Sequence, residues 1–120
     1  MSNPTPAAAV PQPSDRLLLE SRPQRIIAYV GTYTDGTSRG IYRFTFDTAT
    51  GATTEPVLAA EAKNPTFLAL HPSGRFLYAV GEISSFEGAK TGAVSAFAVD
   101  PKTGDLTLLN QQASGGTGPC

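Results

Sequence analysis

A unit of about 50 residues occurs nearly twice in the chain, and this repeat limits the possible folds more than any other feature. Three landmarks recur in the same order: residues 25–31 with 75–81, 44–51 with 97–104, and 64–66 with 118–120. The repeated segments are short, rich in Ile, Val, Tyr, Phe and Thr, and separated by Gly, Pro, Asp and Asn. Short strands joined by turns at this period are typical of a four-stranded β-propeller blade. The repeat therefore predicts an all-β fold with about two antiparallel blades.

Seven strands are expected from the alternation of apolar and polar residues and from the turn signals between them. In the first copy they are residues 25–31, 42–46 and 52–59, and in the second copy 66–70, 76–80, 94–99 and 106–111. The first copy therefore lacks a counterpart of the leading strand of the second. A propeller ring that is closed by a strand from the far end of the chain leaves such a gap in its first blade. We expect residues 25–120 to be the N-terminal part of a propeller domain, truncated at Cys120.

The faces of the strands predict how the blades pack. Tyr42, Phe44 and Phe46 alternate with polar residues, so they share one face, and we expect this face to pack on a neighbouring sheet. Residues 94–99 are largely apolar on both faces, which predicts a strand buried between blades. An Asp-x-x-Thr-Gly pattern follows each of these strands and predicts a hairpin turn that ends on a glycine with positive φ.

The bulk properties exclude several classes of partner. The formal net charge is -1 and no run of Lys or Arg occurs, so neither nucleic acid nor a membrane surface is an expected partner. Residues 1–24 hold five of the ten prolines, and we expect them to form a disordered leader rich in Pro and Ala. They lack the basic start and the long apolar stretch of a secretory signal, which predicts a cytoplasmic protein.

Two residue types that often carry chemistry occur once each. His71 lies in the His-Pro-Ser-Gly turn between strands 66–70 and 76–80 without a recognisable partner, so we expect a structural role. Cys120 is expected to be incidental, because no second thiol, histidine or aspartate lies near it in the sequence. We expect no metal site at either residue.

Four segments resemble the early blades of a known enzyme family. They are YVGTY at residues 29–33, RFLYAVGE at 75–82, the segment 92–110, and SGGTGPC at 114–120. Their order and spacing are similar to those of the seven-bladed β-propeller lactonase family that includes 6-phosphogluconolactonase, over residues 26–120. The resemblance implies a hydrolase of carbohydrate metabolism that acts on a small-molecule sugar lactone. The typical reaction converts 6-phospho-glucono-1,5-lactone to 6-phosphogluconate in the pentose phosphate pathway, without a cofactor.

Within the chain, the resemblance nominates Glu82 as the candidate catalytic residue. The family often has Asn-Glu at this point, whereas this chain has Gly81 before Glu82. A solvated carboxylate at a strand end is the alternative interpretation. Arg75 belongs to a repeated turn, which favours a structural role, and Arg39 has no partner that the sequence identifies. The loop 82–90 is three residues longer than its counterpart and is expected to be flexible and solvated rather than to line a groove.

Further site residues are expected outside this chain. In the family pattern a histidine follows the Pro-Cys pair, and charged residues of the site come from later blades. The chain by itself is therefore expected to be inactive. Two other interpretations stay open, namely a noncatalytic propeller that binds a ligand on the same repeat, and a lactonizing enzyme similar to the muconate cyclases. The sequence does not indicate an oligomeric state.

Overall fold

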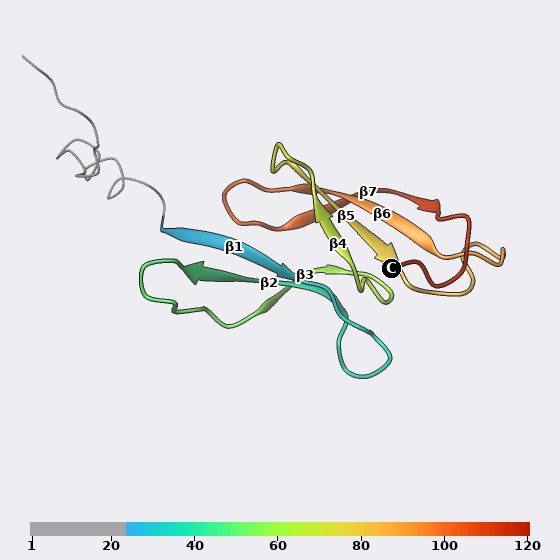
Figure 1. Ribbon diagram of the computed structural model, residues 1–120, viewed down its shortest axis with the longest axis horizontal. Coiled ribbons are helices and arrows are strands. Elements are labelled where there is room, and N and C mark those ends of the chain that lie inside the picture. Colours follow the sequence, from blue (N-terminus) through green and yellow to red (C-terminus); the bar gives the residue numbers. More distant parts are fainter. Residues whose placement is uncertain (1–23) are drawn as a thin grey trace, which may run out of the picture.

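The computed structural model describes residues 24–120, which form two antiparallel β-sheets (Figure 1). The first sheet has three strands in chain order: β1 (Arg25–Val30), β2 (Gly40–Asp47) and β3 (Val57–Glu61). The second has four: β4 (Leu68–Leu70), β5 (Phe76–Gly81), β6 (Ala93–Val99) and β7 (Leu106–Ala113). The all-β prediction is confirmed, and each sheet has the topology of a propeller blade, the first with one strand fewer. Of the predicted leader, residues 1–24, all but Gln24 lie outside the described residues.

The hairpins that join β2 to β3 and β6 to β7 are built in the same way. Asp47 and Asp100 each accept, on Oδ1, a hydrogen bond of 2.8 Å from the backbone N–H two residues later. Gly51 and Gly104 end these turns with φ angles of 80° and 79°, which glycine adopts without a steric penalty. The repeated Asp-x-x-Thr-Gly pattern therefore forms the predicted turns.

β3 is shorter than the sequence predicts. It begins at Val57 rather than at residue 52, and only an isolated bridge between Phe46 and Thr53 extends the pairing toward the turn. Pro56 directly precedes β3 and has no N–H group to donate to β2, so the ladder of hydrogen bonds stops there.

The other differences from the predicted strands lie at strand ends. β4 begins at Leu68 rather than at residue 66, because the Thr66 N–H donates to the Asn64 carbonyl oxygen in a turn, at 2.8 Å. β7 continues to Ala113, which pairs with Ala93 of β6. These shifts leave the number and the order of the predicted strands unchanged.

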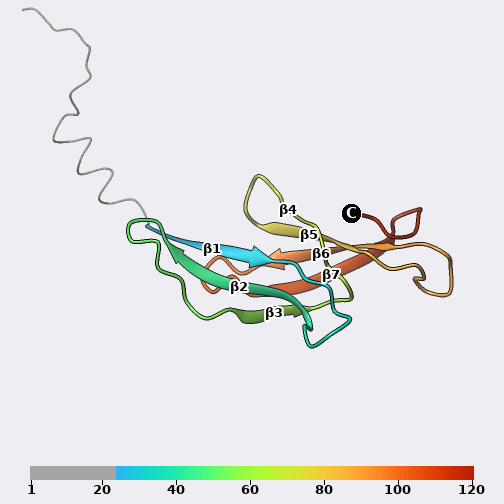
Figure 2. The same ribbon diagram turned by 60° about the horizontal axis from the view of Figure 1, so that its bottom comes forward.

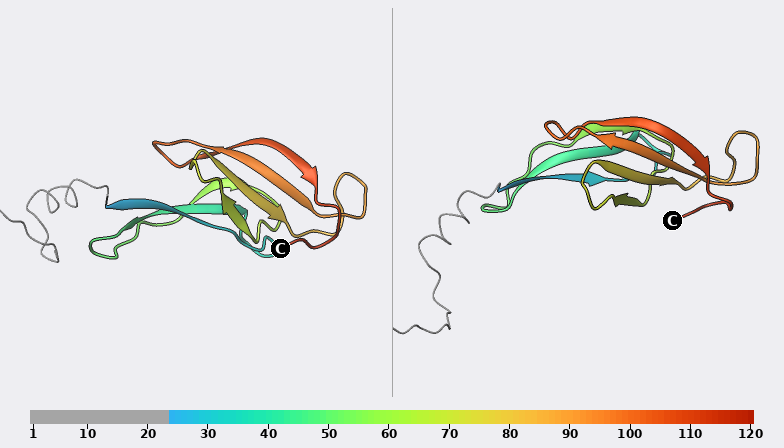
Figure 3. Two further views of the ribbon diagram at one scale, coloured as in Figure 1. Left: turned by 45° about the horizontal axis from the view of Figure 1, so that its top comes forward. Right: turned by 90° about the horizontal axis from the view of Figure 1, so that it is seen from above.

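The two sheets lie against each other and enclose a small core (Figures 2 and 3). Ile41 of β2 is fully buried there and meets three buried residues of the second sheet, Leu77, Ala79 and Phe97. Leu77 and Phe97 are direct partners in the register of β5 and β6. Because burial of apolar surface is the main favourable contribution to folding, this cluster holds the two blades together.

The aromatic face of β2 is not the face that packs on the second sheet, which is the only neighbouring sheet among the described residues. Tyr42, Phe44 and Phe46 alternate with Ile41 and Arg43, and Ile41 is the residue that packs against the second sheet. Successive side chains of a strand point to opposite faces, so the three aromatic residues lie on the face away from that sheet. They are half-buried.

The prediction that residues 94–99 are buried on both faces holds for one face of β6. The fully buried residues alternate along the strand and are Ala93, Ser95 and Phe97. The side chains between them, on the other face, are half-buried. Among the described residues, the neighbouring sheet covers only the first of these faces.

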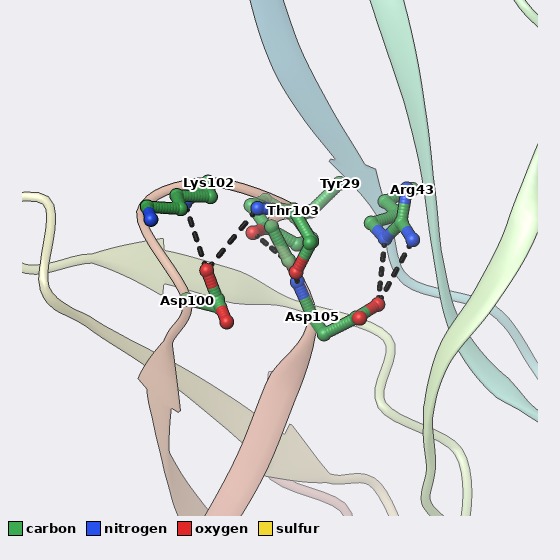
Figure 4. A network of polar contacts seen from close by, with 7 residues as sticks. Tyr29, Arg43, Asp100, Lys102, Thr103 and Asp105 are labelled. Atoms are coloured by element: carbon green, nitrogen blue, oxygen red, sulfur yellow. Dashed lines mark hydrogen bonds and ion pairs between the residues drawn. The ribbon is translucent and has the colours of Figure 1, made fainter.

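Two polar contacts join the β6–β7 turn to the first blade (Figure 4). Tyr29 of β1 donates its hydroxyl hydrogen to the Gly104 carbonyl oxygen at 2.6 Å, and burial raises the pKa of this phenol. Arg43 of β2 lies 2.9 Å from Asp105 Oδ1, and its hydrogen bond holds the pKa of Asp105 below its usual value. The turn is therefore fixed to both strands of the neighbouring blade that it faces.

Residues 24–120 include no helix with the length and apolar character needed to cross a membrane.

Candidate functional site

Segments from both blades meet at the end of the sheets where β1, β3, β5 and β7 finish. Residues 31–39 follow β1, residues 62–67 join β3 to β4, and residues 82–92 follow β5. The C-terminal segment returns to the same place, where Gly118 N–H donates to the Ile83 carbonyl oxygen at 2.9 Å (Figure 1). The fold therefore gathers four loop segments beside the predicted site residue.

Glu82 lies directly after β5, and its half-buried carboxylate accepts hydrogen bonds from two hydroxyl groups. Tyr33 Oη is 3.1 Å from both Oε1 and Oε2, and Thr66 Oγ1 is 2.5 Å from Oε1. Tyr33 belongs to the first blade, 49 residues earlier in the chain. The carboxylate is thus held across the boundary between the blades. Oε2 carries only the shared bond from Tyr33, so it is the oxygen more open to a further donor.

Asn64 connects the segments on either side of this carboxylate. Its Oδ1 accepts hydrogen bonds from the Thr34 backbone N–H at 2.7 Å and from Thr34 Oγ1 at 3.2 Å. Its Nδ2 donates to the Glu82 carbonyl oxygen at 3.3 Å, and its own carbonyl oxygen accepts from the Glu82 N–H at 2.9 Å. Together with Tyr33, Thr66 and Glu82, Asn64 forms what we call the Glu82 cluster.

The close approach of two backbones lets the cluster form. A Cβ atom on Gly31 would lie 2.1 Å from the Pro65 carbonyl oxygen, far inside van der Waals contact. Only glycine therefore lets the segment after β1 pass this close to the Asn64-Pro65-Thr66 connection. This steric constraint explains why the repeated position directly after β1 is a glycine.

The negative charge of Glu82 changes the pKa of the neighbouring Tyr33 phenol. Its hydrogen bond to Glu82 and the negative charge of that carboxylate raise the pKa of the phenol above its usual value. The Tyr33 side chain is otherwise open to solvent, with 59% of its surface exposed. The ring can therefore contact a ligand that approaches Glu82 from solution.

A cavity of about 760 Å³ lies beside the cluster, between the two blades. Gly81 and Ile83 line it, whereas the Glu82 side chain between them is turned toward Tyr33. Ile83, Ser85, Phe86 and Glu87 of the loop 82–90 form part of its wall, so the prediction that this loop lines no groove is wrong. Phe86 and Ala89 exchange two backbone hydrogen bonds of 3.0 and 3.1 Å, which fold the loop back as a tight turn.

Arg39 has the partner that the sequence did not identify. Its guanidinium forms an ion pair with the Glu61 carboxylate at the end of β3, and both residues line the cavity. The two side chains are about two-thirds exposed, so the pair contributes little to stability in water. Arg39 does not contact the Glu82 cluster.

His71 and Arg75 lie at the opposite end of the second sheet, in the turn between β4 and β5. His71 Nδ1 accepts a hydrogen bond from the Ser73 N–H at 3.1 Å, and its ring meets the edges of Phe76 and Tyr78. The Arg75 guanidinium lies 5.6 Å from the centre of the Phe76 ring. These contacts belong to a hairpin turn, as predicted, and they are remote from Glu82.

Cys120 is exposed and lies two residues after Gly118, whose backbone N–H donates to the Ile83 carbonyl oxygen at the same end as the cluster. Within the described residues, no group of three His, Cys, Asp or Glu side chains is placed to hold a metal ion.

Sequence reasoning nominated Glu82 but missed the residues that bind it. Tyr33 ends the YVGTY segment and Thr66 belongs to the repeated landmark 64–66, but neither pattern indicates a contact with Glu82, which only the fold reveals. The only feature of the sequence that marked Asn64 was the repeat, because Asn64 occupies the place that Gly118 has in the second copy.

Comparison with known proteins gives consistent matches. A family model described as a lactonase with a seven-bladed β-propeller matches residues 27–120. The 6-phosphogluconolactonase of Bacillus subtilis is 42% identical over 96 residues, which are 80% of this chain and 26% of that protein.

Two solved structures are similar in fold and in sequence. One is a candidate 6-phosphogluconolactonase from Bacteroides uniformis, with a TM-score of 0.74 and 39% identity over 82% of this chain and 27% of that one. The other is a periplasmic gluconolactonase from Pseudomonas aeruginosa, with a TM-score of 0.71 and 32% identity over 79% of this chain and 26% of that one. The chain thus spans about a quarter of the length of the relatives that it matches.

Proposed function

The chain belongs to the lactonase family of seven-bladed β-propellers, and from this premise we propose that it forms the first two blades of an enzyme that hydrolyses a sugar lactone. We propose 6-phospho-glucono-1,5-lactone as the substrate and 6-phosphogluconate as the product. The kinship with proteins named 6-phosphogluconolactonase supports this choice. The remaining blades, which this segment does not include, supply the rest of the site.

One observation carries the proposal within this chain, namely the anchored carboxylate of Glu82. Tyr33 and Thr66 fix its orientation from two different segments, and Oε2 stays open to accept a hydrogen bond from water. Glu82 then acts as a general base that takes a proton from water as the water oxygen attacks the lactone carbonyl carbon. The protonated carboxyl returns that proton to the ring oxygen when the bond between this oxygen and the carbonyl carbon breaks.

The test is the rate of lactone hydrolysis by the complete protein that contains this segment. Removing a general base typically lowers the rate by about 10² to 10⁴-fold, so we expect the Glu82→Gln variant to lose kcat to that extent. Glu55→Gln is the matched control, since Glu55 is an exposed carboxylate that precedes β3, at the end of the first sheet opposite to the cluster. Full kcat in Glu82→Gln would contradict the assigned role. A wild-type protein that binds the lactone without turnover would favour the noncatalytic propeller instead.

A cytoplasmic location goes with this substrate, because a phosphorylated sugar lactone is charged and does not cross a bilayer unaided. The related protein from Pseudomonas aeruginosa is described as a periplasmic gluconolactonase. Comparing kcat/KM for the phosphorylated and the unphosphorylated lactone, together with cell fractionation, separates the two cases. A preference for the unphosphorylated lactone in an exported protein would contradict the cytoplasmic assignment.

A further inference from the structure

We propose that Asn64 is a positioning residue that sets the geometry between Tyr33 and Glu82 across the boundary of two blades. This inference rests on the proposed function of Glu82. Asn64 touches neither the carboxylate nor the Tyr33 hydroxyl. It is bonded instead to the backbone next to Tyr33 and to the backbone of Glu82 itself.

Asn64 forms hydrogen bonds both through its backbone and through its side-chain amide. Its backbone carbonyl oxygen accepts from the Glu82 N–H at 2.9 Å, and its backbone N–H donates to Thr34 Oγ1 at 3.1 Å. These two bonds use backbone atoms only, so they do not depend on the side chain at position 64, provided that it is not proline. The side-chain amide adds three more, two from Thr34 to Oδ1 and one from Nδ2 to the Glu82 carbonyl oxygen. The amide therefore ties together two loops that are separate in the sequence.

The repeat shows that the turn alone does not require this amide. Asn64 has a φ angle of 45°, in the left-handed region, and Gly118 at the equivalent place of the second copy has 61°. Glycine adopts such angles without steric cost, whereas asparagine does so with some penalty. A glycine would thus satisfy the backbone at position 64 as it does at 118. The reason for an asparagine lies in the three bonds that its side chain makes.

The consequence concerns the carboxylate. Thr34 follows Tyr33 directly, so the bonds from Thr34 to Oδ1 fix the loop that carries the phenol. The bond from Nδ2 fixes the backbone that carries Glu82. Without the amide the two segments move independently, and a displacement of about 1 Å at a reacting group can cost about 10²-fold in rate.

The experiment compares variants of the complete protein. Asn64→Gly removes the amide but keeps the φ angle, and we expect kcat to fall by about 10 to 100-fold, with a smaller change in KM and a melting temperature close to that of the wild type. Asn64→Asp keeps the acceptor for Thr34 and loses the donor to Glu82, so its kcat should lie between the two. Asn110→Gly is the matched control, because it removes the same side chain from an exposed position on β7 and should leave kcat unchanged.

Amide hydrogen exchange gives a readout that does not depend on turnover. In Asn64→Gly the Thr34 N–H loses its acceptor and should exchange faster, whereas the Glu82 N–H keeps the backbone carbonyl of residue 64 as its acceptor and should stay protected. Wild-type kcat in Asn64→Gly, or a loss of kcat that follows a loss of folded protein, would overturn the inference. If Glu82→Gln also keeps full kcat, the proposed function fails. If only Glu82→Gln is inactive, the positioning role alone fails.

Discussion

At the scale of single residues, the candidate site depends on the contact between Tyr33 and Glu82. The phenol donates to a carboxylate that lies 49 residues further along the chain. A hydrogen bond to the neutral phenol and a nearby negative charge both disfavour the phenolate. This explains why the pKa of Tyr33 lies above the usual value of about 10.

We predict that the Glu82→Gln variant lowers the pKa of Tyr33 toward that usual value. The amide of glutamine carries no charge, so the phenolate forms more easily in the variant. The pKa can be followed by the ¹³C chemical shift of the Tyr33 ring in a pH titration, with the signal assigned from the Tyr33→Phe protein. Glu55→Gln serves as the control and should leave this titration unchanged. An unaltered Tyr33 pKa in Glu82→Gln would mean that the two side chains do not interact in solution.

At the scale of secondary-structure elements, the β6–β7 hairpin fixes the angle between the blades. Its turn reaches over the first sheet and places Gly104 and Asp105 against Tyr29 and Arg43 (Figure 4). A Cβ atom on Gly104 would lie within 3.0 Å of the Ile27 side chain, so the turn also packs closely. The Asp-x-x-Thr-Gly turn after β2 makes no such contact to a second blade among the described residues.

We predict that Tyr29→Phe lowers the free energy of unfolding by about 1 kcal/mol, the typical net contribution of one hydrogen bond. The change removes only the hydroxyl, and so it leaves the Gly104 carbonyl oxygen without this donor. Denaturant unfolding of the two proteins measures the difference. Tyr78→Phe is the control, because the described structure gives the Tyr78 hydroxyl no hydrogen-bond partner and the residue is exposed. Equal losses in both variants would refute a specific role of the Tyr29 bond.

At the scale of the whole molecule, the two blades bury only the single boundary that they share. Large apolar side chains are exposed on or beside both sheets, among them Ile26, Val30, Phe67, Leu70 and Leu109, each between 41% and 61% exposed. Repeat proteins need several neighbouring units to form a continuous core. The described residues therefore present surface of the kind that further blades cover in a full propeller.

We predict that residues 1–120, when produced alone, bind a hydrophobic dye, self-associate and show no lactone hydrolysis above the spontaneous rate. Exposed apolar patches of this kind promote association, and the site residues of later blades are missing from this segment. Dye fluorescence, light scattering and a lactonase assay at equal protein concentration test the three parts. The complete protein is the control for each of them. A monomer that melts cooperatively at high temperature, or one with clear turnover, would contradict this prediction.

The sequence by itself determined the blade repeat, the order of the seven strands and the two hairpin turns. These features are local, because alternation, turn residues and glycine positions act over a few neighbouring residues. It did not determine which face of β2 packs on the second sheet, because Ile41 and the aromatic residues on the opposite face both suit a buried position. Only the contact with the second blade decides between them.

The candidate site divides in the same way. Glu82 was nominated from the family resemblance, at its place after a repeated strand. Its partners come from two other segments: Tyr33 from the loop after β1, and Asn64 and Thr66 from the connection between β3 and β4. No local rule links residues that are 16 to 49 positions apart. Their association depends on the close passage of Gly31 past Pro65, which is a property of how the two blades pack. The sequence thus supplied the carboxylate, and the tertiary structure alone supplied the groups that orient it.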